Sequence, residues 1–376
     1  MKNVSIEPKR RAWVEVDLDA LRSNFGSIAE RLPPGCGILP MVKADAYGTG
    51  LGRAVRALSG LGPWGFGVAT TDEGLEVRSH GWAGPVLVFA PTLPADVRDL
   101  IERRLEAVVS GCELLGASGV AARAHGGTLS VHLEIDTGMG RFGVASARMG
   151  SMADEVAALL SLGGLELRGT LTHFHSADRG DGSTMEQWRR FEAAVTALRA
   201  AGVDPGRIHA ANSAAILRYE GLAADIVRPG IRLYGGGRWE PRGRPVVSVR
   251  ARVLEVKSVD AGATVSYGAT WQAPRATRLA TIGIGYGDGL SRKMSNRGRM
   301  LLRGRPAPIR GVVCMDTTVV EIGDREDVGA GDVATVLGRD GEVEIGLDEL
   351  ADIGETIDYE ILTGWSRRLP RIEVER

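Results

Sequence analysis

The strongest constraint on the fold is an alternation of short apolar segments with helix-like segments through roughly the first 230 residues. The predicted strands are residues 38–42, 65–69, 85–90, 106–110, 129–135, 165–174, 207–211 and 225–228. Nearly continuous apolar strands that alternate with amphipathic helices indicate buried parallel strands. Eight such units predict a closed (β/α)8 barrel. An open doubly wound sheet is the alternative, but no GxGxxG motif opens a helix after the first strand.

The pattern changes after residue 237. Val247, Val249, Ala251 and Val253 alternate with polar residues, and glycine and aspartate turns follow at short intervals. At the other end, Asp17 is the expected N-cap of the first helix. We therefore predict a barrel over residues 17–237 and a mainly antiparallel β domain over residues 238–376, which an N-terminal strand at residues 11–16 joins.

The composition argues against several classes of protein. A formal net charge of -1 gives no overall field that would attract nucleic acid or an anionic membrane. No apolar run is long enough to span a bilayer, and the N-terminus lacks the apolar segment of a signal peptide. Three widely spaced cysteines without a CxxC motif indicate neither a disulfide framework nor a zinc ribbon. We expect a cytoplasmic protein with no nucleic-acid or membrane partner.

Chemically useful residues gather at the C-terminal ends of the predicted strands, where barrel enzymes place their chemistry. Lys43 follows the first strand, and burial at that position lowers the pKa of a lysine and makes its amine a better nucleophile and base. Such an amine suits an aldehyde cofactor, although a lysine here could also reach solvent at the rim. The loops after the last two strands offer the Ser213 hydroxyl and the backbone near Gly230 as an anion site.

The histidines favour a rival hypothesis. His173 and His175 stand two residues apart at the end of the sixth predicted strand, a spacing that places both on one face of a strand. Such a pair can hold a metal ion, with His209 and Asp178 as further ligands, as in barrel hydrolases. A simpler interpretation is that one histidine points into the barrel and the other packs outside it.

Nine short motifs occur in order along nearly the whole chain. They are MVKADAYG (41–48), DTGMGR (136–141), THF (172–174), ANSA (211–214), RPGI (228–231), VSYG (265–268), GYGDG (285–289), CMD (314–316) and DYE (358–360). Together they closely resemble the alanine racemases, which belong to the pyridoxal-phosphate barrel family of amino-acid racemases. The resemblance implies a barrel with its cofactor on the rim, a β domain, and a homodimer in which the second domain completes the other subunit's active site.

The resemblance also implies a function. It implies that a small amino acid is racemised with pyridoxal 5'-phosphate as cofactor, most simply L-alanine to D-alanine for the cell wall. Racemisation removes a proton from one face of Cα and returns it to the other, so it needs two bases. A broader amino-acid racemase, for example of serine, is an alternative. A pyridoxal-phosphate carrier would need Lys43 but neither Tyr267 nor the motif at 314–316.

Roles for individual residues follow from the resemblance alone. Lys43 resembles the cofactor-binding lysine and the base for the D-enantiomer, and Tyr267 of the partner resembles the base for the L-enantiomer. The residues that resemble phosphate ligands are Tyr47, Ser213, Gly230, Ile231 and Tyr359. Asn212 belongs to the cofactor site, Arg228 resembles the arginine that faces the pyridine nitrogen, and His173 supports it. Arg141 and Met315 resemble substrate-carboxylate ligands, and the supporting residues are Glu134, Asp316, Tyr286, Asp178 and Arg292. No residue is assigned to a metal.

Two positions depart from the family pattern. Many members carry a lysine, modified to a carbamate, at the position of Glu134, and many carry an arginine at the position of Val312. His132, Glu134 and Asp136 share one face of their strand, which we expect to point into the barrel. We therefore predict that Glu134 supplies the carbamate's negative charge to Arg141, directly or through a water or an anion. The alternative is that Glu134 bonds backbone groups only. Val312, at the expected substrate access, leaves the preferred amino acid open.

Overall fold

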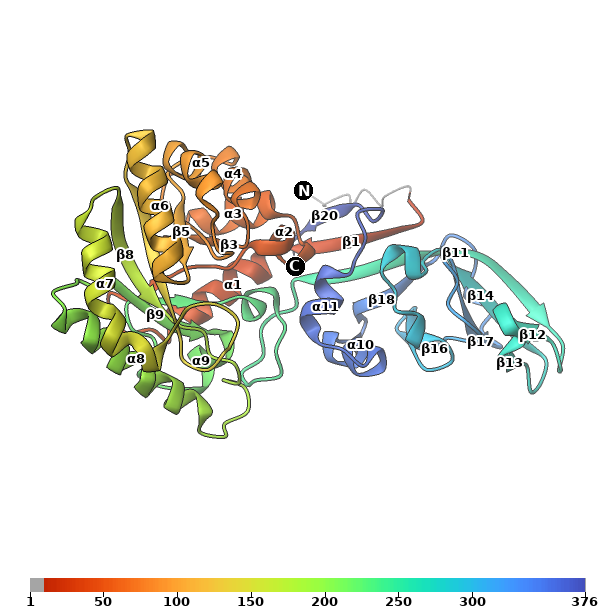
Figure 1. The fold of residues 1–376 in the computed structure, drawn as a ribbon. Helices are drawn as coiled ribbons and strands as arrows, with labels where there is room; N and C mark the ends of the chain where they lie inside the picture. The colour runs from red at the N-terminus through yellow and green to blue at the C-terminus, as the bar shows by residue number, and fades with distance from the viewer. Residues whose placement is uncertain (1–9, 376) are drawn as a thin grey trace.

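The computed structural model describes residues 10–375. Figure 1 shows a helix-covered parallel sheet at one end of the molecule and an antiparallel sheet system at the other. The long strand β11 (Val247–Val259) and the N-terminal strand β1 (Ala12–Asp17) run between the two parts. No helix within residues 10–375 is long and apolar enough to cross a membrane.

The parallel sheet is the predicted barrel. Its strands are β2 (Gly37–Ile38), β3 (Phe66–Val68), β4 (Val86–Val88), β5 (Glu106–Val109), β6 (Leu129–Asp136), β8 (Leu165–Leu171), β9 (Arg207–Asn212) and β10 (Ile226–Arg228). They follow the order β2-β10-β9-β8-β6-β5-β4-β3. A parallel bridge between Met41 and Gly67 links the segment after β2 to β3 and closes the ring. The prediction of an eight-stranded α/β barrel is thus confirmed.

Most barrel strands are shorter than predicted, and the early ends of β2 and β8 bear on candidate residues. The regular ladder of β2 stops at Ile38, and Pro40, which has no N–H to donate, lies between it and the Met41 bridge. Strand β8 ends at Leu171, so His173 and His175 lie beyond the ladder. Their assignment to one face of a strand was therefore wrong, because strand alternation no longer governs their side chains.

Helices cover the outside of the barrel. They are α1 (Leu18–Ala29), α3 (Leu51–Ser59), α4 (Thr71–Ser79), α5 (Val97–Glu102), α6 (Cys112–His125), α7 (Met149–Ser161), α8 (Ser183–Ala200) and α9 (Ser213–Arg218). The segment α2 (Lys43–Gly48) lies at the rim and is a left-handed turn rather than a right-handed helix. Asp17 caps α1 as predicted, since its Oδ1 accepts a hydrogen bond from the Ala20 N–H at 2.8 Å. Helix α1 buries Leu21, Phe25 and Ile28, and each such side chain contributes about 1.5–3 kcal/mol to folding.

The two faces of each barrel strand pack into different cores. Leu39, Leu87, Val108, Leu171 and Ile226 form a small cluster of their own inside the barrel. The alternate residues, such as Val131, Leu133 and Ile135 of β6, belong to the larger core under the helices. This leaves the other face of β6, which carries His132 and Glu134, pointing into the barrel as predicted.

The second part is mainly antiparallel, as predicted. Its main strands are β11, β14 (Thr277–Ile282), β15 (Arg299–Leu302), β16 (Arg305–Pro308), β17 (Thr318–Gly323), β18 (Val333–Asp340) and β19 (Val343–Ile345). Strand β1 pairs antiparallel with β11 and parallel with β20 (Arg371–Val374). Strands β12 (Thr264–Val265) and β13 (Trp271–Gln272) form a separate hairpin.

Two helices, α10 (Leu347–Gly354) and α11 (Asp358–Thr363), interrupt the β structure. Helix α11 packs against α2 of the barrel. Asp358 also ties α11 to the segment that leaves the barrel, because it accepts a hydrogen bond from the Gly237 N–H at 2.8 Å. The second part of the chain thereby delivers Tyr359 to the barrel rim beside Lys43.

Candidate active site

Lys43 begins a turn of unusual handedness. The next four residues, Ala44 to Tyr47, all have positive φ, between 51° and 56°. None is a glycine, and each such residue costs roughly 1–2 kcal/mol relative to a right-handed conformation. The turn therefore requires contacts from outside to hold it.

Two carboxylates hold this turn. Glu73 of α4 accepts hydrogen bonds from the N–H groups of Ala44 and Ala69, each at 2.7 Å. Asp45 accepts one from the Leu51 N–H, also at 2.7 Å. We did not identify Glu73 from the sequence. The signal was present, because Thr70 and Glu73 have the spacing of a capping box, which the structure forms.

The amine of Lys43 lies in a positive environment. Burial lowers its pKa first, the charges of Arg141 and Arg228 lower it further, and Glu73 opposes them. The lysine lines a hollow at the barrel rim together with Tyr47 and Tyr359. A larger fraction of this amine is unprotonated near neutral pH than of a free lysine, which is what a nucleophile and base requires.

The loops after β9 and β10 form a compact polar cradle. Ser213 Oγ accepts hydrogen bonds from the Gly230 N–H at 2.9 Å and the Arg232 N–H at 3.3 Å, which leaves the hydroxyl proton free to donate. A Cβ at Gly230 would lie 2.2 Å from Tyr47 Oη, so only glycine lets the hydroxyl come this close. Beside it, Ile231 is fully buried. The groups are those that a phosphate site needs.

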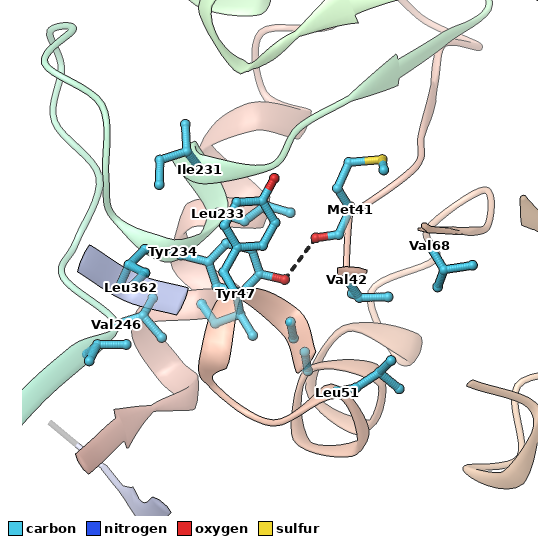
Figure 2. Packing of buried hydrophobic residues seen from close by; sticks show 14 of the residues in the cluster. Met41, Val42, Tyr47, Leu51, Val68, Ile231, Leu233, Tyr234, Val246 and Leu362 are labelled. Atoms are coloured by element: carbon cyan, nitrogen blue, oxygen red, sulfur yellow. Dashed lines mark hydrogen bonds between the residues drawn. The ribbon is translucent and has the colours of Figure 1, made fainter. Parts of the chain in front are cut away.

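Tyr47 is fixed by aromatic packing (Figure 2). Its ring stacks on Tyr234 with centroids 4.5 Å apart. The Tyr359 ring, on the rim, lies 6.1 Å from it. Tyr234 in turn donates a hydrogen bond to the Met41 carbonyl at 2.9 Å. Burial raises the pKa of Tyr47 above its usual range and that of Tyr359 to about 12. Both phenols therefore keep their protons and can donate to an anion.

Arg228 is buried at the end of β10. Its guanidinium donates to the carbonyls of Thr172 at 2.8 Å and Ala210 at 3.1 Å, and it meets the rings of His209 at 3.1 Å and His173 at 3.3 Å. Burial lowers its pKa to about 10, so it stays charged at neutral pH. Burial and the nearby cations lower the pKa of His173 to about 3, which keeps that ring neutral.

Asn212 and Asp178 lie at the edge of the site rather than in the hollow beside Lys43. Asn212 caps α9 by accepting a hydrogen bond from the Ala215 N–H at 3.1 Å. Asp178 is exposed on the loop after β8, and its charge helps to raise the pKa of Tyr359, after burial. Both therefore border the cradle and the rim.

Glu134 lies inside the barrel but does not bond Arg141. Glu134 is 5% exposed, whereas Arg141 is exposed on the loop after β6. Neither side chain makes a hydrogen bond or an ion pair with any residue within 10–375. Burial raises the pKa of Glu134, and Arg228 opposes this shift more than Arg141 does. The direct pair and the backbone-bonded alternative are thus both absent, and a link through a water or an anion stays a prediction.

The remaining candidates lie together on the β domain, outside the hollow beside Lys43. Tyr267 is 71% exposed and Met315 52% exposed. Backbone hydrogen bonds tie Tyr286 to Cys314 at 3.0 Å and Gly287 to Met315 at 2.9 Å. The Ser266 hydroxyl donates to the Val312 carbonyl at 2.5 Å, which brings the Tyr267 segment to the same face.

Asp316 and Arg292 complete this second group. Asp316 pairs with Arg368 at 2.5 Å, and Arg292 begins the short helix η6 (Arg292–Met294) on the surface. The structure therefore divides the candidate residues between two separate places on one chain.

The histidines do not form a metal site. His175 bonds the Ser176 hydroxyl at 2.7 Å, while His209 meets His132 and Arg228. Within the described part of the chain, no group of three or more His, Cys, Asp or Glu residues could hold a metal ion. The hydrolase hypothesis therefore lacks its site.

Comparison with known proteins agrees with the two-part geometry. The family models described as "Alanine racemase, N-terminal domain" and "Alanine racemase, C-terminal domain" match residues 16–237 and 246–373. The alanine racemase of Carboxydothermus hydrogenoformans is 41% identical over 372 residues, 97% of this chain and 100% of that protein. This chain belongs to the alanine racemase family.

Solved structures of the family share the whole fold. The alanine racemase of D-cycloserine-producing Streptomyces lavendulae superposes with a TM-score of 0.93 at 34% identity, over 98% of each chain. The Bartonella henselae alanine racemase, described with covalently bound pyridoxal phosphate, gives 0.88 at 25% identity, over 97% of this chain and 100% of that one. The resemblance drawn from nine motifs is therefore confirmed.

Proposed function

We propose that this chain is a pyridoxal-phosphate-dependent alanine racemase that interconverts L- and D-alanine. The observation that carries the proposal is the rim hollow, where an amine of lowered pKa, Lys43, shares one cavity with Tyr47 and Tyr359. The Ser213–Gly230 cradle and the buried Arg228 are at the same end of the barrel. Family membership supports the same activity.

The residues at the rim suit this cofactor. Pyridoxal phosphate, when bound, supplies an aldehyde for an amine and a ring that takes up the electron pair released at Cα. The hydroxyls of Tyr47, Ser213 and Tyr359 would hold the phosphate, with Gly230 and Ile231 forming the floor and Asn212 fixing the helix behind it. Arg228, supported by His173, would face the ring nitrogen and keep a proton off it.

Two bases would move the Cα proton. Lys43 Nζ would serve one face, for the D-enantiomer, and Tyr267 Oη the other, for the L-enantiomer. Because Tyr267 is exposed and outside the hollow, we propose that the partner subunit of a homodimer supplies it. Met315 of the same face and Arg141 at the rim would bind the substrate carboxylate.

Other parts of the chain would support this arrangement. Tyr286 and Asp316 would shape the β-domain face, while Asp178 and Arg292 would line the substrate access. We propose that the two domains divide at residue 237, with the N-terminal strand counted in the β domain. We also propose that the protein acts in the cytoplasm, where it makes D-alanine for the cell wall. A broader specificity through Val312 is not favoured, because the relatives described above are alanine racemases.

The test combines labelling with exchange. Borohydride reduction of the purified protein should fix a chromophore to the peptide that carries Lys43, and label on Lys257 or Lys293 would refute the assignment. In heavy water, L-alanine and D-alanine should each exchange their Cα proton and lose optical activity. A protein that binds the cofactor but exchanges neither would be a carrier.

A further inference from the structure

Four buried polar side chains form a continuous hydrogen-bonded chain through the barrel. Arg228 Nη1 lies 3.1 Å from His209 Nδ1, and His209 Nε2 lies 2.8 Å from His132 Nδ1. His132 Nε2 lies 2.8 Å from Glu106 Oε2. Both imidazoles are fully buried, and Arg228 and Glu106 are 3% and 7% exposed. Arg228 ends β10 and Glu106 begins β5, so the chain runs from the catalytic rim to the opposite end of the barrel.

The arginine sets the direction of every bond in this chain. A guanidinium has donors and no acceptor, so His209 Nδ1 must present its lone pair to Arg228. His209 then carries its proton on Nε2 and donates to His132 Nδ1. His132 likewise carries its proton on Nε2 and donates to the Glu106 carboxylate. Each donor therefore points toward Glu106, and no other assignment satisfies all three contacts.

The chain joins two opposite charges through two neutral rings. Within residues 10–375, Arg228 has no carboxylate in contact, although Glu134 acts on it through space. Burial, Arg228 and His132 hold the pKa of His209 well below its usual range, which agrees with a neutral ring. In a low-dielectric interior, consecutive hydrogen bonds of one direction polarise and strengthen one another.

A glycine on the strand between the two histidines makes room for their contact. His132 of β6 and His209 of β9 are not on neighbouring strands, because β8 lies between them. Gly169 of β8 is paired with His132, and a Cβ there would lie 2.4 Å from His132 Nδ1, the atom that meets His209. A side chain at this position would therefore displace the ring from its partner.

We propose that Glu106 is a positioning residue for Arg228, which it orients through His132 and His209 from the far end of the barrel. A buried N–H without an acceptor is unfavourable, so the carboxylate fixes the His132 ring. The His132 ring in turn fixes the orientation of His209. The His209 Nδ1 acceptor then restricts the rotation of the Arg228 guanidinium. The consequence for catalysis rests on the proposed function, in which Arg228 faces the cofactor ring. The existence of the hydrogen-bonded chain does not depend on that function.

Nitrogen NMR of the unaltered holoenzyme tests the chain directly. The protein has six histidines, so 15N-histidine labelling gives a small set of ring signals, which substitution of His132 and His209 in turn assigns. From the hydrogen-bond directions, we expect each ring to carry one proton, on Nε2. A proton on Nδ1 of either ring, or two protons on either, would overturn the assignment. This result does not depend on racemase activity.

Three variants test the action on Arg228. Glu106→Ala leaves His132 without an acceptor, and we expect kcat to fall about tenfold and the absorption band of the Lys43-bound cofactor to shift. Glu106→Gln keeps an acceptor oxygen, so it should recover most of both properties. Glu166→Ala is the matched control, because Glu166 lies at the same end of the barrel on β8 but bonds Ser130 and Arg168 instead.

The outcomes separate the two proposals. Wild-type rate and spectrum in Glu106→Ala, or a Gln variant no better than Ala, would refute the positioning role. If Glu106→Ala fails to fold, His132→Gln removes the Nδ1 acceptor that His209 meets, without removing a charge, and should shift the same absorption band. An unshifted band there would likewise count against the role. A wild-type protein that acquires no chromophore at Lys43 would instead refute the proposed function.

Discussion

The barrel rim carries a candidate tyrosine that is buried and packed, whereas the exposed face of the β domain carries a candidate tyrosine that is neither. At the rim, Tyr47 is 6% exposed, stacked and closed in by the cradle, whereas Tyr267 on the β domain is 71% exposed. Preorganised groups hold a cofactor with little reorganisation on binding. An exposed tyrosine without such packing has no fixed position for proton transfer. The difference supports the proposal that one chain supplies the rim and that the β-domain face of a second subunit completes the site.

The largest effect expected from this comparison is that of Tyr267→Phe. The rim is untouched by this change, so borohydride should still label Lys43. Racemisation should fall about 10²- to 10⁴-fold, the usual worth of a general acid–base group. Proton exchange measured separately from L-alanine and D-alanine should show the greater loss with L-alanine.

Tyr286→Phe is the control, because it removes a phenol of the same face that is not assigned to proton transfer. Full racemisation by Tyr267→Phe would show that another residue is the second base. Equal losses from both enantiomers would contradict the assignment of Tyr267 to one face.

Mixing inactive subunits tests whether the two places belong to different chains. Lys43→Ala and Tyr267→Phe subunits, unfolded and refolded together, should form mixed dimers that contain one intact site. Random pairing predicts recovery to about a quarter of the wild-type rate. Mixing either variant with itself is the control. No recovery in verified mixed dimers would place Lys43 and Tyr267 of one site on the same chain.

The sequence was most informative where a periodic pattern decides the structure. Continuous apolar segments predicted the eight strands, and alternation along β6 predicted that Glu134 points inward. The left-handed turn at 44–47 was not predictable, since its residues individually disfavour positive φ and only contacts such as that of Glu73 sustain them. The Glu106–His132–His209 chain also escaped prediction, because it depends on which inward side chains of different strands meet.

One expectation was wrong, and one contact is absent in its direct form. His173 and His175 were placed on one strand face from the predicted length of the strand, and a direct Glu134–Arg141 pair was expected from the family motif. In the structure β8 ends before the histidines, and Arg141 lies on an exposed loop while Glu134 stays inside. Sequence proximity fails as a guide at the ends of strands, where the chain leaves the ladder.

Glu73→Gln should give an intermediate effect on the rim. The variant keeps one acceptor oxygen, but its NH2 group would face one of the two backbone N–H donors, Ala44 or Ala69. Losing one such bond to a charged acceptor costs about 1.5–3 kcal/mol. We expect weaker retention of the cofactor, measured as its dissociation constant from refolded apoprotein, with Tyr267-dependent proton exchange reduced in proportion.

The exposed Glu76 of the same helix provides the control, as Glu76→Gln changes a charge but no contact of the turn. Unaltered cofactor affinity in Glu73→Gln would show that the turn is held by Asp45 and the surrounding core alone.

The smallest effect is expected from Glu134→Gln, inside the rim. A buried pair broken on one side costs about 3–5 kcal/mol, but Glu134 has no such contact within residues 10–375. The kcat of the variant should therefore change less than about fivefold.

The same variant tests how Glu134 affects stability. The pKa of Glu134 is raised above its ordinary value of 4.5, so the folded state binds a proton more readily than the unfolded state. Wild-type stability from this group therefore falls as pH rises above about 4.5, through the folded pKa. Glutamine lacks this loss, and the melting temperature of the variant relative to wild type should rise over that range. A relative melting temperature that falls with pH, together with a hundredfold loss of kcat, would show that Glu134 works as a paired carboxylate after all.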